Sequence, residues 1–143
     1  MTRNLIYTLD FEERSEELEQ DISFVPTESL RERYFGNYWE GKSNSHYNEI
    51  WQHDIDGDQD RSPGEEHFDD VETPEKVLNR AVSLLQEIES KYTNKLIILV
   101  SHGDTLQILQ TGFVGVHPRR QRTLPHLNTA EVRHLSTTSK TGQ

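Results

Sequence analysis

The chain has 143 residues, of which 31% are hydrophobic and 28% are charged. This length and composition fit one domain with a modest core and long polar loops. The formal net charge of −10 argues against non-specific binding to nucleic acid or to an anionic membrane surface, although a local basic pocket could still hold an anionic substrate. The absence of cysteine excludes disulfides and thiolate metal sites.

The first 27 residues predict no leader and no membrane segment. Residues 5–9 form an apolar run that could be a short strand, and residues 11–22 could form an acidic helix. The run turns acidic too early for a secretory signal, and no stretch of the chain approaches the ~20 apolar residues of a membrane helix. We therefore expect a soluble, cytoplasmic protein.

Residues 28–72 predict loops that contain two candidate sites, a catalytic carboxylate and a stretch with the spacing of a calcium loop. Residues 30–42 are rich in aromatic side chains, which favours a loop pinned by burial that holds a catalytic carboxylate, Glu32, in place. The alternative is a surface turn in which Glu32 and Arg33 are solvated. Residues 43–72 predict a solvated acidic insertion. The spacing from Asp54 to Glu65 imitates a calcium loop, but Gln59 stands where the loop needs glycine, so calcium binding stays only an alternative.

Thr73 and Pro74 predict the start of a helix that carries one apolar stripe and ends at residues 93–94. The apolar run 96–100 predicts a strand buried on both faces, followed by a turn at residues 101–103 and a helix over residues 104–110 closed by Gly112. In α/β sheets, ligands bind at the carboxyl end of such a strand. His102 lies there, and the alternative is that it only caps the strand by hydrogen bonding.

The last part of the chain predicts a basic tract, an edge strand and a tail. Residues 117–122 concentrate positive charge and could bind an anion such as phosphate, or form a solvated loop. Residues 129–135 have strand character, and from Ser136 onward we expect a disordered tail.

Four features in this order resemble the histidine phosphatase superfamily, in its phosphoglycerate mutase-like branch. They are residues 30–36 (LRERYFG) with 40–42 (EGK), the helix at Pro74, residues 99–103 (LVSHG) and residues 128–135 (NTAEVRHL). The resemblance implies an α/β fold, a three-layer α/β/α sandwich, incomplete here at the N-terminus. It also implies a phosphorylated small molecule or a phosphoprotein as substrate, and no metal or organic cofactor. The domain layout becomes a divergent segment 1–27, a partial phosphatase-like domain 28–135 and a tail 136–143.

The resemblance also implies roles for single residues. His102 resembles the second active-site histidine, which contacts the transferring phosphoryl group. Glu32 resembles the acid that protonates the leaving alcohol and later activates water. Arg33, Ser101 and Gly103 are the predicted substrate- and phosphate-binding residues, the last two because they shape the turn.

The sequence departs from the family pattern at the nucleophile. The family carries it in an Arg-His-Gly signature on its first strand, and these 143 residues contain no such signature. Their one Arg-His pair, Arg133-His134, is followed by Leu135. We therefore expect negligible turnover by this chain alone, as for a truncated form of a longer enzyme. The alternative is a non-catalytic scaffold or regulatory protein that retains part of the fold.

Overall fold

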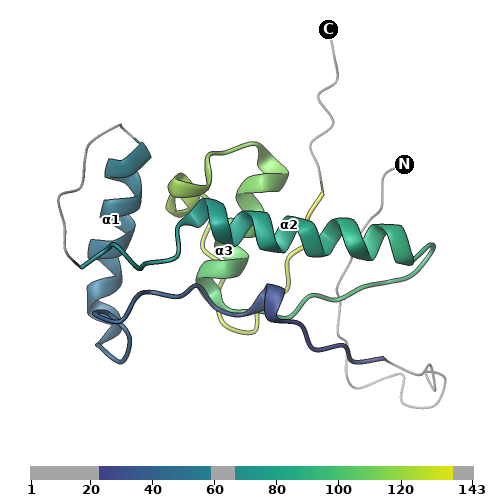
Figure 1. Ribbon diagram of the computed structural model, residues 1–143. Helices are drawn as coiled ribbons and strands as arrows, with labels where there is room; N and C mark the ends of the chain where they lie inside the picture. Colours follow the sequence, from purple (N-terminus) through teal and green to yellow (C-terminus); the bar gives the residue numbers. More distant parts are fainter. Residues whose placement is uncertain (1–22, 59–66, 137–143) are drawn as a thin grey trace, which may run out of the picture.

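The structure is a computed structural model, which describes residues 23–58 and 67–136 (Figure 1). Its elements are η1 (Glu28–Leu30), η2 (Asn44–His46), α1 (Tyr47–Asp58), α2 (Pro74–Lys91), α3 (Gly103–Val114) and η3 (Pro118–Thr123). Helix α2 packs against α3, and η3 contacts all three α-helices. In Figure 1, α2 crosses the molecule and α1 stands at one end of it. The predictions for residues 5–9, 11–22 and 137–143 fall outside the described residues.

Helix α2 confirms the helix predicted at Thr73 and Pro74. The Thr73 side chain accepts a hydrogen bond from the Lys76 amide at 3.4 Å, and Pro74 takes the first helical position, where its missing N–H costs nothing. Val77 and Ala81, on the predicted apolar stripe, are fully buried. The helix ends at Lys91, and Asn94 follows with a φ of 54°.

Helix α3 confirms the predicted helix after His102 but extends further than predicted. Gly112 lies inside it, and a Cβ at this position would come within 3.1 Å of the Leu78 side chain on α2. Glycine therefore allows the two helices to approach closely. The residue that ends α3 is Gly115, whose φ of 72° is the left-handed conformation that favours glycine.

Residues 43–58 differ from the predicted solvated insertion, because most of them form α1. Ile50 of α1 is fully buried against Phe35, Trp39 and Val71. The side chains of Phe35 and Trp39 are each only 6% exposed, which confirms that aromatic residues pin this loop. The apolar periodicity of α1 is weak, so the helix depends on this tertiary contact rather than on its own pattern.

The predicted α/β class and its three-layer sandwich are wrong for residues 23–58 and 67–136, which contain helices but no strand. The run 96–100 has no regular secondary structure, and Leu96, Ile98 and Val100 are 66%, 51% and 74% exposed. The predicted edge strand is absent too, and its first residues form a turn closed by a bond from the Glu131 amide to the Asn128 carbonyl. A strand requires a neighbouring strand for its backbone groups, and the described residues contain no strand that pairs with either segment.

Candidate functional site

The Glu32 side chain lies at the N-terminal turn of α3. Its Oε1 atom accepts hydrogen bonds from the backbone amides of Thr105, at 3.1 Å, and Arg33, at 2.8 Å. The Thr105 hydroxyl lies 3.1 Å from the same oxygen and 2.8 Å from the Arg31 carbonyl, to which it can donate. The carboxylate is thereby fixed at the positive end of the α3 dipole, where a negative charge is stabilised.

His102 lies between two contacts that join its segment to the Glu32 loop. On one side, the Ser101 hydroxyl donates to the Leu30 carbonyl at 2.6 Å, and on the other Thr105 binds the loop as described. His102 is the N-cap residue of α3, with extended backbone and an exposed side chain that makes no capping bond. Its imidazole is therefore accessible to a ligand. Gly103 begins the helix, and a Cβ there would meet nothing within 4 Å.

Arg33 faces the interior and is only 2% exposed. Its guanidinium binds both carboxylate oxygens of Asp54 on α1, at 2.7 and 2.8 Å, and lies 3.4 Å from Asp104 on α3. Its Nε atom donates to the Glu72 carbonyl at 2.7 Å. Burial opposes the charge of Arg33, but the contacts with Asp54 and Asp104 raise its pKa, so it stays charged. In this arrangement Arg33 joins α1, α3 and the loop at residues 72–73.

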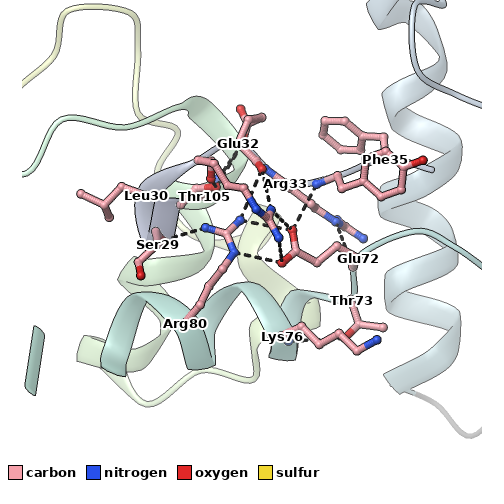
Figure 2. A network of polar contacts seen from close by, with 12 residues as sticks. Ser29, Leu30, Glu32, Arg33, Phe35, Glu72, Thr73, Lys76, Arg80 and Thr105 are labelled. Carbon is pink, nitrogen blue, oxygen red and sulfur yellow. Dashed lines mark hydrogen bonds and ion pairs between the residues drawn. The ribbon is translucent and has the colours of Figure 1, made fainter. Parts of the chain in front are cut away.

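A second network, shown in Figure 2, centres on Glu72. Its carboxylate accepts two bonds from Arg31, at 2.7 and 3.0 Å, and two from Arg80, at 2.9 and 3.2 Å. The Tyr34 amide adds a fifth at 3.1 Å. Burial alone would raise the pKa of Glu72, but the bonds from Arg31, Arg80 and Tyr34 lower it to about 2. Glu72 is therefore ionised at neutral pH.

A cavity of about 710 Å³ lies beside Glu32. The residues that line it are Arg31, Glu32, Arg33, Tyr34, Phe35, Glu40, Tyr47, Asp69, Asp70, Val71, Glu72 and Lys76. Of the predicted site residues, Glu32 and Arg33 are on this lining, whereas Ser101, His102 and Gly103 lie outside it. Glu32 thus connects the cavity to the first turn of α3.

Two arginines of the basic tract contact other elements of the fold. Arg119 binds Glu75 of α2 at 2.5 Å, with Arg119 only 20% exposed. The Arg122 guanidinium lies over the Trp51 ring, 3.8 Å from its centre, and the Trp51 indole donates to Asp104. These two arginines therefore hold η3 against α2 and α1.

Neither a metal cluster nor a membrane helix is found in the part of the chain that the structure describes. There, no group of three or more histidine, aspartate or glutamate side chains is placed to hold a metal ion. Asp54, the first residue of the calcium-like pattern, has both carboxylate oxygens bonded to Arg33, and Glu65 lies outside the described residues. No helix there is long and apolar enough to cross a membrane.

Several residues of these networks carry no signal in the sequence. Arg80 lies on a helix that its capping and its apolar stripe predict, but neither signal indicates a role for Arg80, and its partner carbonyl at Ser29 is far away in the chain. Asp54 stands in a stretch whose composition predicts a solvated loop, and Glu72 lies outside every motif. These contacts form only when the fold brings α1, α2 and the loop together, so no local pattern in the sequence indicates them.

Comparison with known proteins matches the chain to a family model. The model of the histidine phosphatase superfamily (branch 1) matches residues 12–143. No curated protein and no solved structure matches the chain significantly. The family match extends over nearly the whole chain and includes Glu32, His102 and the segments joined around them. The chain belongs to the histidine phosphatase superfamily, branch 1.

Proposed function

We propose that the first turn of α3 and the loop 30–33 form a phosphoryl-binding half-site, which acts on a phosphorylated small molecule or a phosphoprotein. One observation carries the proposal. The Glu32 carboxylate is bonded to the Thr105 amide in the first turn of α3, directly after the exposed His102. In this proposal, the group that transfers the proton and the histidine that binds phosphate are held by the same helix terminus.

The chemistry of phosphoryl transfer fits these groups. The reaction depends mainly on positioning and on positive charge around the phosphoryl oxygens. The first amides of a helix have no partner within it, so those of Gly103 and Asp104 can donate to a phosphoryl oxygen together with the His102 imidazole. Glu32 keeps its second oxygen, Oε2, without a hydrogen bond in the described structure, and this atom can carry the proton to a leaving alcohol. The cavity beside Glu32 accommodates the alcohol part.

We further propose that this chain alone does not turn over substrate. A histidine nucleophile would divide hydrolysis into phosphorylation and dephosphorylation of the enzyme, and the 143 residues contain no Arg-His-Gly to supply it. The role of Arg33 in this proposal is to hold the Glu32 loop, because its donors already bind Asp54, Asp104 and Glu72.

A non-catalytic scaffold or regulatory protein is the second candidate. The observation that favours it is the exposed apolar run at Leu96, Ile98 and Val100. Exposed apolar side chains that gather in one segment are typical of sites that bind another protein. The two candidates differ in whether the half-site binds phosphate at all.

Titration with inorganic phosphate, followed by the amide resonances of Gly103 and Asp104, separates the two candidates. We expect shifts in the native chain and in the control His134→Ala, and binding weaker by about tenfold in His102→Ala, equivalent to roughly 1.4 kcal/mol. Shifts absent from the native chain would leave the scaffold candidate. In parallel, we expect no hydrolysis of p-nitrophenyl phosphate above background. Hydrolysis that disappears in His102→Ala would overturn the proposed lack of turnover.

A further inference from the structure

We propose that Arg80 of α2, together with Glu72, is a positioning residue for Glu32. The inference rests on the proposed function in one respect, namely that Glu32 is the group that moves a proton. Arg80 does not reach the Glu32 carboxylate. It binds the backbone that carries it, by donating to the Ser29 carbonyl at 2.8 Å and to the Glu32 carbonyl at 3.4 Å (Figure 2).

Glu72 extends this attachment beyond Glu32. Its carboxylate binds Arg80 twice, Nε to Oε1 at 2.9 Å and Nη2 to Oε2 at 3.2 Å, and accepts the Tyr34 amide at 3.1 Å. The loop is therefore held at Ser29, Glu32 and Tyr34. With the backbone fixed on both sides of Glu32, only its side-chain torsions remain to aim the carboxylate at the Thr105 amide.

The geometry requires an arginine on α2. A guanidinium has five donors in one plane, and Arg80 uses all three of its nitrogens to reach two carbonyls and one carboxylate. A lysine ammonium cannot span these acceptors. The Arg80 and Glu72 side chains are only 15% and 9% exposed, so water does not readily replace the bonds. The burial of α2 itself is carried by other residues, Val77 and Ala81 among them.

A second ion pair that involves α2 separates the positioning of Glu32 from the general stability of the fold. Arg119 and Glu75 form a comparable ion pair at 2.5 Å, with side chains 20% and 36% exposed. This pair joins η3 to α2, and neither of its side chains bonds to the loop that carries Glu32. Loss of Arg119 removes a guanidinium that η3 brings to α2, whereas loss of Arg80 removes one that α2 itself carries, and only the second loss removes bonds to the loop that carries Glu32.

The test uses two amide resonances that report on Glu32. The amides of Arg33 and Thr105 both donate to Glu32 Oε1, so both should shift with one common inflection when Glu32 is titrated with acid. We expect this common inflection in the native chain and in Arg119→Ala, and its loss in Arg80→Ala. Its retention in Arg80→Ala, or its loss in Arg119→Ala as well, would overturn the proposal.

A second pair of variants keeps the test decisive if Arg80→Ala does not fold. Glu72→Gln preserves the side-chain shape but turns an amide group toward the donors of Arg80 or Tyr34, and we expect it to lose the inflection as well. Glu75→Gln is its control. The proposal is contradicted if the Arg33 and Thr105 amides show the same common inflection in both variants. Phosphate binding at the Gly103 and Asp104 amides is measured separately, so a failure of the proposed function is distinguished from a failure of this inference.

Discussion

The loop around Arg33 and the apolar run 96–100 lie on adjoining segments but in opposite environments. Arg33 is 2% exposed, whereas Val100 is 74% exposed. The two segments meet where the Ser101 hydroxyl binds the Leu30 carbonyl. A charged residue is thus inside the fold while the most apolar run of the chain is at its surface.

The difference shows what each kind of residue requires for burial. Arg33 is buried because Asp54 and Asp104 balance its charge and its donors find acceptors. The apolar run has strong β propensity, but its backbone groups require a neighbouring strand that the described residues do not provide. Apolar character alone therefore does not bury a segment, and complete pairing can bury a charge.

The largest expected effect comes from removing the buried cation. Arg33→Met leaves the carboxylates of Asp54 and Asp104 without their partner, which should lower the free energy of unfolding by about 3–5 kcal/mol. Urea denaturation measures this loss. Lys91→Met, which removes an exposed ion pair with Glu87, should change the free energy of unfolding far less. Similar losses in both variants would mean that the buried network contributes little.

Matched isoleucine truncations sharpen the comparison between the two regions. Ile108 on α3 is fully buried, so Ile108→Ala should lower the free energy of unfolding by about 2–5 kcal/mol. Ile98 in the apolar run is half exposed, so Ile98→Ala should change the free energy of unfolding by no more than ~0.5 kcal/mol. Urea unfolding of both variants checks this, and a large loss for Ile98→Ala would show that the run is buried in solution.

Acid should weaken the network at Glu72. Its pKa is about 2 in the folded chain, below the ordinary value of 4.5, so its contribution to stability is complete above pH 4.5 and is lost as the pH falls toward 2. Urea midpoints measured from pH 6 to pH 2 should therefore fall less steeply in Glu72→Gln than in the native chain. Identical slopes in Glu72→Gln and in the native chain would contradict the account.

The smallest predicted effect concerns the bond between α3 and the Glu32 loop. Thr105→Val keeps the side-chain shape but removes the hydroxyl that donates to the Arg31 carbonyl, which should lower the free energy of unfolding by about 1 kcal/mol. Thr129→Val, at an exposed turn, is the matched control and should change stability by no more than ~0.5 kcal/mol. Thermal or urea unfolding of the pair decides whether this contact stabilises the loop.

The sequence predicted those elements whose signals are local. Thr73 and Pro74 predicted the start of α2 because capping and a fixed proline φ act within one turn. The helix after His102 was predicted as well, but Gly112 was mistaken for its end, because the reason for that glycine is contact with Leu78 on another helix.

The rest of the site depends on contacts between distant segments. The resemblance predicted that Glu32 and His102 act together, and the structure joins their segments through Ser101 and Thr105. The residues that hold this arrangement, Arg80 and Glu72, could not be identified from the sequence. Their hydrogen bonds join α2 and the segment before it to a loop about 40–50 residues earlier in the chain, and no local pattern encodes such a distance.

Native-state hydrogen exchange tests most directly whether the polar network, rather than the apolar run, forms the ordered part of this chain. The amides of Arg33, Tyr34 and Thr105 donate to Glu32 or Glu72 and should exchange slowly. The exposed residues Leu96, Ile98 and Val100 should exchange at close to the rates of an unfolded chain. Protection of these three amides equal to that of Thr105 would contradict the account and would indicate a strand paired in solution.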